Sequence, residues 1–79
     1  MKKEIERLID KYEEKVNYRK YRLGEEKEKL ARVLEKYDKE ECSFETLERQ
    51  QRSEAIQQDL LIEVAGILED LKEVAKEGK

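Results

Sequence analysis

Residues 5–38 read IERLIDKYEEKVNYRKYRLGEEKEKLARVLEKYD. Apolar residues recur along this stretch at alternating intervals of four and three residues, which brings them to one side of an α-helix. Ten positions follow this spacing: Ile5, Ile9, Tyr12, Val16, Arg19, Leu23, Glu26, Leu30, Val33 and Tyr37. All of them except Arg19 and Glu26 are apolar or aromatic. The pattern therefore predicts one long helix over about residues 3–38.

Gly24 is the weak position within this predicted helix. A glycine in a helix interior costs about 1 kcal/mol relative to alanine, so Gly24 can kink the helix or split it in two. The residues that follow, 25–29, are again good helix formers. We therefore expect helical structure on both sides of Gly24.

A second helix is predicted over about residues 44–76, after a polar connection at residues 39–43. Ser43 is a suitable N-cap, because its hydroxyl can accept a hydrogen bond from a free backbone N–H group of the first turn. The apolar residues of this helix gather in its later part and form a face broader than a two-stranded seam needs. They are Leu60, Leu61, Val64, Ala65, Ile67, Leu68, Leu71, Val74 and Ala75.

Two features of the second helix each allow two interpretations. Its first half carries a run of amide and hydroxyl side chains, namely Gln50, Gln51, Ser53, Gln57 and Gln58. These side chains either form a polar layer that selects one helix register, as buried amides do in coiled coils, or they face water. Gly66 either forms a notch that Tyr12 or Val16 fills, or it is an exposed glycine that the helix tolerates.

The composition supports long helices rather than disorder. Charged residues make up 49% of the chain, yet the net charge is only −3 and the two signs alternate. Alanine, glutamate, lysine, leucine and arginine account for 48 of the 79 residues, and proline is absent. Residues 1–40 hold 13 basic and 11 acidic residues, whereas residues 41–79 hold 5 and 10, so the two predicted helices should attract each other weakly.

The short connection predicts an all-α, antiparallel two-helix hairpin that forms a single domain over residues 1–79. Two helices alone shield only about one side of each apolar stripe, and chains this short bury a modest fraction of their surface. We therefore expect the hairpin to assemble as a homodimeric four-helix bundle or coiled coil. A complex with a different protein is the second possibility.

The sequence argues against several kinds of site and location. With one cysteine, Cys42, and no histidine, the chain can form neither an internal disulfide nor a Cys/His zinc site. The first residues lack the apolar core of a signal peptide, and no stretch approaches the roughly 20 apolar residues that cross a bilayer. We predict a cytoplasmic protein with no membrane contact, metal or cofactor.

An enzymatic role is also disfavoured. Three carboxylate pairs, Glu25-x-x-Glu28, Glu35-x-x-Asp38 and Glu45-x-x-Glu48, have the spacing with which all-helical nucleotide pyrophosphatases hold magnesium. The first two pairs lie on the same predicted helix and cannot face each other within one chain, and all three occupy ordinary solvent-facing positions with lysines among them. The chain also lacks a recognisable pairing of a nucleophile with a base. We therefore predict that this protein is not an enzyme.

The stretch from Lys15 to Arg22 indicates a possible nucleic-acid contact. Basic side chains can neutralise phosphates, and tyrosine can stack on exposed bases. The candidate contacts are Lys15, Tyr18, Arg19, Lys20 and Arg22. Glu13 and Glu14 lie beside them and the chain is acidic overall, so nucleic-acid binding is the alternative function rather than the leading one.

Four segments resemble the short helical accessory proteins of phages and prophages of Gram-positive bacteria. They are residues 8–15 (LIDKYEEK), 43–45 (SFE), 54–56 (EAI) and 67–73 (ILEDLKE). This resemblance implies a regulatory protein that binds a host or phage protein, and it identifies no site residues.

The leading prediction is a non-enzymatic protein-protein interaction module. Its interface is predicted from the apolar stripes of both helices: Ile5, Ile9, Tyr12, Val16, Leu60, Leu61, Val64, Ile67, Leu68, Leu71 and Val74.

Overall fold

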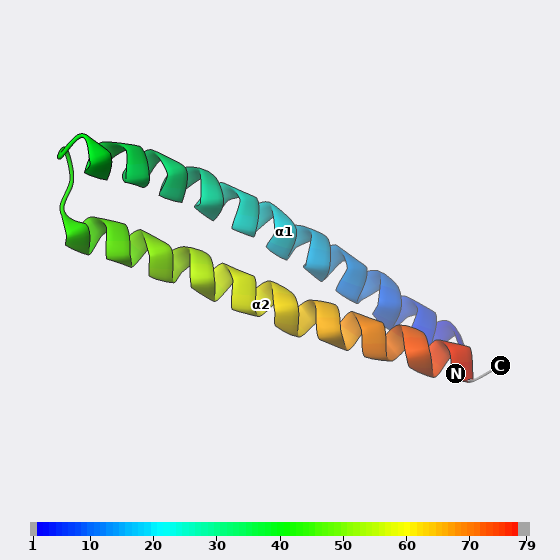
Figure 1. Cartoon of the computed structure of the whole chain (residues 1–79). Coiled ribbons are helices and arrows are strands. Elements are labelled where there is room, and N and C mark those ends of the chain that lie inside the picture. The colour runs from blue at the N-terminus through cyan, green and yellow to red at the C-terminus, as the bar shows by residue number, and fades with distance from the viewer. Residues whose placement is uncertain (1, 78–79) are drawn as a thin grey trace.

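Two long helices form an antiparallel hairpin in a computed structural model that describes residues 2–77. Helix α1 (Lys2–Asp38) and helix α2 (Phe44–Glu77) lie side by side along their whole length, and residues 39–43 join them (Figure 1). The hairpin measures 59 × 14 × 12 Å, and both chain ends lie at the end opposite the loop. The predicted all-α hairpin is confirmed.

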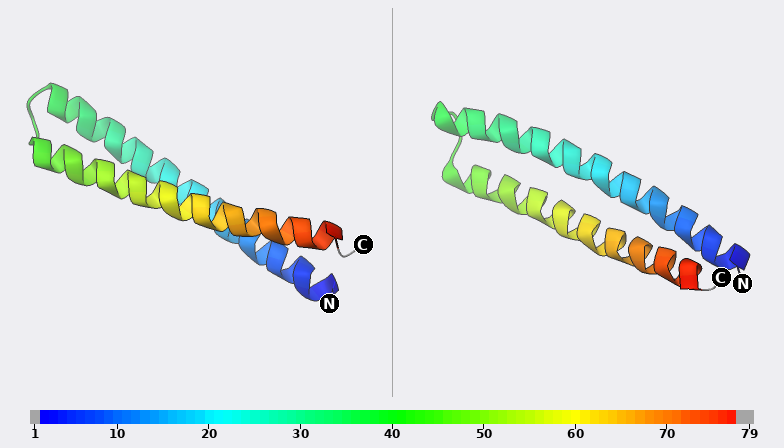
Figure 2. Two further views of the ribbon diagram at one scale, coloured as in Figure 1. Left: turned by 60° about the horizontal axis from the view of Figure 1, so that its bottom comes forward. Right: turned by 45° about the vertical axis from the view of Figure 1, so that its right-hand side comes forward.

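Helix α1 runs without interruption through Gly24 (Figure 2). The glycine therefore does not split the helix, because the strong helix formers on both sides outweigh its local cost. A Cβ atom added at Gly24 would meet nothing within 4 Å. Its missing side chain thus serves no close packing within the hairpin.

The end of α1 is a Schellman motif without the usual glycine. The N–H of Glu41 donates to the carbonyl of Lys36 at 2.8 Å, and the N–H of Glu40 donates to the carbonyl of Tyr37 at 3.0 Å. Glu40 has a φ of 61°, a left-handed conformation that costs a residue with a side chain about 1 kcal/mol or more. The motif turns the chain toward α2.

Helix α2 begins with the N-cap that the sequence predicts. The N–H of Thr46 donates to Oγ of Ser43 at 3.2 Å, which satisfies one of the free donors of the first turn. The rings of Tyr37 and Phe44 lie 6.3 Å apart and tilted by 58°, so they close the loop end from opposite sides of the connection.

The seam between the helices is thin. Apart from one carboxylate, the buried side chains are Val16, Leu47 and Leu68, and no described side chain is completely buried. The predicted stripe of α1 faces α2, except for Tyr37 near the loop, which is exposed. The facing row of α2 is Leu47, Gln50, Glu54, Gln57, Leu61, Val64, Leu68, Leu71 and Ala75.

The accessible surface of the hairpin is large for its mass. It measures 6467 Å² for 9.5 kDa, whereas a compact monomer of that mass exposes about 5,000 Å². The difference is about 1,400 Å² and follows from the elongated shape. In the described part of the chain, neither helix meets the length and apolarity needed to span a membrane.

Candidate functional site

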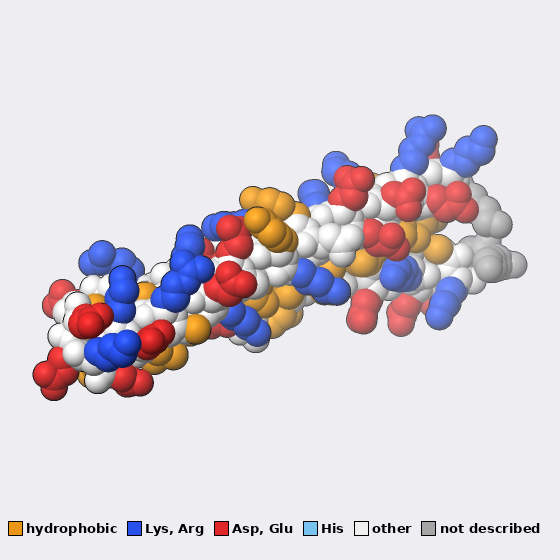
Figure 3. Space-filling model, turned by 90° about the horizontal axis from the view of Figure 1, so that it is seen from above, with side chains coloured by type: hydrophobic (Ala, Val, Ile, Leu, Met, Phe, Trp, Pro, Cys, Tyr) orange, Lys and Arg blue, Asp and Glu red, His pale blue; other side chains and the backbone are white. Residues whose placement is uncertain are grey.

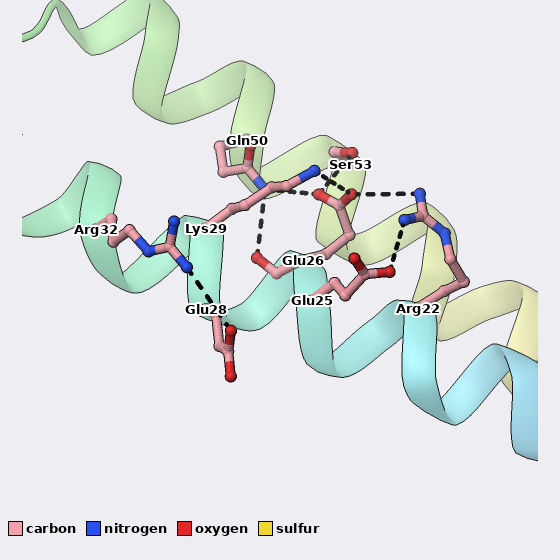
Figure 4. Close-up of polar contacts among 8 residues, drawn as sticks. All are labelled: Arg22, Glu25, Glu26, Glu28, Lys29, Arg32, Gln50 and Ser53. Carbon is pink, nitrogen blue, oxygen red and sulfur yellow. Dashed lines mark hydrogen bonds and ion pairs between the residues drawn. The ribbon is translucent and has the colours of Figure 1, made fainter.

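A buried carboxylate lies within the seam, nearer to the loop than to the start of α1. Glu26 of α1 is only 4% exposed, although its position in the stripe would suit an apolar side chain. The amide of Gln50 donates to Oε2 of Glu26 at 2.7 Å and to its backbone carbonyl at 3.3 Å. The hydroxyl of Ser53 donates to the same Oε2 at 3.0 Å (Figure 4). Two residues of α2 thus bind one residue of α1.

Two cations of α1 complete this arrangement from the side. Arg22 Nη2 lies 3.6 Å and Lys29 Nζ lies 3.7 Å from Oε1 of Glu26, while Arg22 Nη1 donates to Glu25 at 3.0 Å (Figure 4). The hydrogen bond from Gln50 is the main cause that lowers the pKa of Glu26. The hydrogen bond from Ser53 and the two cations lower it further, against the effect of desolvation.

The chemistry of this cluster is structural. A carboxylate that accepts hydrogen bonds from two neutral donors and has a lowered pKa is a poor proton acceptor at neutral pH. Gln50 and Ser53 therefore form a polar layer in the seam and do not face water. Gln57 is half-buried as well, with a buried Oε1 that has no hydrogen-bond partner among the described residues. Gln51 and Gln58 are exposed and face away from the seam.

The helical spacing of α1 places Glu26 on the stripe but indicates no role for it. The signal that could have found it is a charged residue at a seam position in one helix combined with amide and hydroxyl residues at seam positions in the other. Only the alignment of the two helices shows that these positions meet.

The face of the hairpin that carries the polar cluster's cations also carries an uncovered apolar row. Side chains seven residues apart return to nearly the same side of a helix. On α1 this side holds Leu8, Lys15, Arg22 and Lys29, and on α2 it holds Ser53, Leu60, Ile67 and Val74. We call this side of the hairpin the stripe face. The ion pair between Glu13 and Lys72, at 3.8 Å, lies on the opposite side of the seam.

Four apolar residues of α2 on this side form what we call the uncovered stripe: Ile56, Leu60, Ile67 and Val74. Ile56 is 58%, Ile67 37% and Val74 51% exposed, and Leu60 is half-buried. Leu8 of α1 is also exposed on the stripe face. The broad apolar face predicted for α2 is therefore divided, because α1 covers one row of it and leaves the neighbouring row open.

A shallow groove of about 430 Å³ runs along the stripe face between the helices. Its lining consists of Lys11, Glu14, Lys15, Tyr18 and Arg19 of α1 with Val64 of α2. Lys15 Nζ lies 4.8 Å from the centre of the Tyr12 ring, and Arg19 Cζ lies 5.5 Å from the centre of the Tyr18 ring. The aromatic faces in and beside the groove are thus already in contact with cations of the same helix.

The candidate nucleic-acid residues are only partly brought together. Lys15, Tyr18 and Arg19 line the groove. Lys20 is exposed and does not line it, and Arg22 forms ion pairs with Glu25 and Glu26 instead. Residues that are consecutive in the basic stretch therefore point to different sides of the helix and make different contacts.

The predicted interface residues also divide into two groups. Most of them face the other helix of the same hairpin: Ile5, Ile9, Tyr12, Val16, Leu61, Val64, Leu68 and Leu71. Leu60, Ile67 and Val74 lie on the stripe face. The two rows therefore differ in what covers them, since only the first row is covered within the hairpin.

The notch hypothesis for Gly66 is wrong within the hairpin. A Cβ atom added there would meet nothing within 4 Å, so neither Tyr12 nor Val16 fills the position. Gly66 is exposed because it lies beyond the rows that face α1.

Charged side chains of both signs cover much of the surface, and hydrophobic side chains emerge between them in patches (Figure 3). Within residues 2–77, no three acidic, cysteine or histidine residues are grouped as a metal ion would require. Cys42 is half-buried beside the loop, and its Sγ donates to the carbonyl of Val33 at 3.5 Å. Comparison with known protein families, curated proteins and solved structures finds no match to this chain.

Proposed function

We propose that this chain is a non-enzymatic protein-binding module that uses the stripe face to bind the apolar side of another helical chain. The observation that carries the proposal is the uncovered stripe. It continues the helical spacing of the covered row, yet Ile56 and Val74 are more than half exposed. Rows of apolar residues at this spacing are what one amphipathic helix offers to another.

The polar cluster of the seam supports a binding role rather than a chemical one. Glu26, the buried ionisable side chain of the seam, is occupied by hydrogen bonds within the hairpin. The resemblance to phage accessory proteins suggests that the bound protein is a phage or host component. A reducing compartment such as the cytoplasm suits this role, because Cys42 has no second cysteine in the chain to pair with.

Affinity capture from the native host tests the proposal. The test compares the wild-type chain with the double variant Ile67→Ser/Val74→Ser and with the control variant Ile62→Ser. Ile62 is 62% exposed but lies outside the stripe. We expect the wild type and the control to retain the same helical protein and the double variant to lose it. Equal retention by all three would contradict the proposal, as would a folded wild type that retains no helical chain, neither a host protein nor a second copy of itself.

Nucleic-acid binding is a second candidate, favoured by the three predicted residues that meet in the groove: Lys15, Tyr18 and Arg19. Fluorescence anisotropy with labelled single-stranded RNA and DNA at low and moderate salt tests it. If this function is correct, the affinity falls steeply as the salt concentration rises, and Lys15→Ala/Arg19→Ala weakens binding of both RNA and DNA. If neither salt nor this variant changes the binding, the groove is not the nucleic-acid binding site.

A further inference from the structure

The proposed function does not identify the helical chain that covers the uncovered stripe. The following inference rests on that function. We propose that the occupant is a second copy of this chain. The two hairpins pack stripe face on stripe face with both loops at the same end. Each α1 then lies on α2 of the other copy, and a two-fold axis runs along the bundle.

The exposed area of the hairpin fits this assembly. The chain exposes about 1,400 Å² more than a compact monomer of its mass. A standard protein-protein interface buries about 800 Å² on each partner. One contact with a second copy can therefore remove most of this excess.

The position of the apolar residues along the hairpin selects the orientation. We call residues 2–19 with 59–77 the open half and residues 20–58 the loop half. Lys15 and Val64 line the same groove and so lie level with each other. Two helical turns further toward the chain ends, Leu8 lies level with the segment between Ile67 and Val74. The apolar surface of the stripe face thus lies mainly in the open half, on both helices.

Only one of the two possible two-fold arrangements brings these apolar surfaces together. With the loops at the same end, Leu8 of one copy meets Ile67 and Val74 of the partner. With the loops at opposite ends, α2 packs antiparallel on α2 of the partner. Ile67 and Val74 of one copy then face the loop-half residues of the same row in the other copy, Thr46 and Ser53. That arrangement would cover apolar side chains with polar ones.

Charge favours the same arrangement. In the open half, the α1 edge of the stripe face carries Lys11 and Lys15, which line the groove. The α2 edge carries Glu63 and Asp70, which follow Ile56 at intervals of seven residues. Placing α1 on α2 of the partner brings these opposite charges level with each other.

The groove gives the partner's apolar side chains a place to pack. Its lining runs from Lys11 to Arg19 and includes Val64 of α2; the partner's apolar side chains would pack there against Val64, Tyr18 and the aliphatic stems of the basic residues. In the arrangement with both loops at the same end, Ile67 of the partner lies over this segment of α1. The contact repeats by symmetry, so the assembled bundle covers both stripes.

A spin label on the single native cysteine tests the orientation directly. Cys42 lies beside the loop, and the hairpin is 59 Å long. Loops at the same end place the two labels within about 20 Å, because packed helices lie 8–10 Å apart. Loops at opposite ends place them near the full hairpin length. We expect the short distance by double electron-electron resonance, and the long distance would overturn the arrangement.

A second labelling site guards against disturbance of the half-buried cysteine. In the variant Glu41→Cys/Cys42→Ser the label sits on an exposed position of the same loop. It should report the same short distance. Both distance measurements use the stripe as it is, so they do not depend on whether a disrupted interface still folds.

Sedimentation equilibrium tests the stripe face itself. We expect a dimer for the wild type, and a dissociation constant raised by about a hundredfold or more for Ile67→Glu, which places a charge in an apolar contact. The control Ile62→Glu adds the same charge at an exposed position outside the stripe and should leave the constant unchanged. Equal weakening by both variants would overturn the assignment of this face.

Charge reversal tests the pairing of α1 with α2 of the partner. Glu63→Lys/Asp70→Lys should weaken the dimer about tenfold, and adding Lys11→Glu/Lys15→Glu to the same chain should restore it. Failure to restore would contradict the pairing. A helical wild type that stays monomeric would remove the second copy as the occupant, and the proposed function would still stand if host capture depends on Ile67 and Val74.

Discussion

The loop half and the open half of this hairpin consist of the same two helices but are joined by different interactions. At the centre of the loop half, Gln50 and Ser53 bind the carboxylate of Glu26. In the open half the seam is apolar, with Val16 and Leu68 as its buried residues. Hydrogen bonds to one carboxylate can form in only one alignment of the helices, whereas apolar contacts can form in several. Both halves bury apolar side chains, since Leu47 of the loop half is also buried, but only the loop half adds hydrogen bonds across the seam that depend on the helix register.

The largest expected effect concerns burial in the open half. Leu68 is 8% exposed, and Leu68→Ala should lower the free energy of unfolding by about 3 kcal/mol, because it removes apolar contact and leaves a cavity. Urea unfolding at a fixed protein concentration measures the change. Leu34→Ala makes the same chemical change at an exposed position and should cost much less. Equal losses would show that the seam of the open half is not where apolar burial stabilises the chain.

The next effect concerns register in the loop half. Glu26→Ala should cost about 2 kcal/mol, because the amide of Gln50 and the hydroxyl of Ser53 lose their acceptor inside the seam. Glu28→Ala removes a carboxylate of the same helix whose ion pair with Arg32 is exposed, so it should change stability little. A larger loss of stability from Glu28→Ala than from Glu26→Ala would contradict the role assigned to Glu26.

The halves should also differ in their response to acid. The folded state lowers the pKa of Glu26 below its ordinary value of 4.5, chiefly through the hydrogen bond from Gln50. The stabilisation from Glu26 is therefore complete above pH 4.5 and is lost as the pH falls through 4.5 and then through the lowered pKa. The difference in stability between the wild type and Glu26→Gln should shrink on acidification. Thermal unfolding monitored by circular dichroism over this pH range measures it, and a constant difference would contradict the assignment.

The smallest effects come from the two helical glycines, one in each half. Gly24→Ala and Gly66→Ala should each raise the free energy of unfolding by about 1 kcal/mol, because alanine favours helix and its Cβ meets nothing at either position. Urea unfolding measures both. A loss of stability at Gly66 alone would indicate that another chain packs closely at that position in solution.

The sequence contained enough information for the helices and for the seam positions of α1. Helical periodicity is a local property, so the alternating spacing from Ile5 onward located the buried side of α1. Ser43 was identified as the cap because N-capping depends on a residue and the turn that follows it. The absence of proline left both predicted helices uninterrupted.

Other features depended on residues far apart in the chain. Glu26 and its partners Gln50 and Ser53 are separated by 24 and 27 residues, and no local pattern says which hydroxyl or amide meets which carboxylate. The left-handed backbone conformation of Glu40 could not be predicted either, because this position of a Schellman motif is usually glycine. Gly66 was placed in a possible notch from its apolar neighbours, yet no side chain of α1 reaches it.

By itself, then, the sequence determined that this protein forms two amphipathic helices with a short connection, because spacing and capping act within a few residues. Only the tertiary structure decided which row of α2's broad apolar face α1 covers and which row, Leu60, Ile67 and Val74, remains open. The reason is that one helix of about 10 Å diameter covers a limited arc of its neighbour. Which arc it covers depends on contacts between residues far apart in the chain, such as those of Glu26 with Gln50 and Ser53.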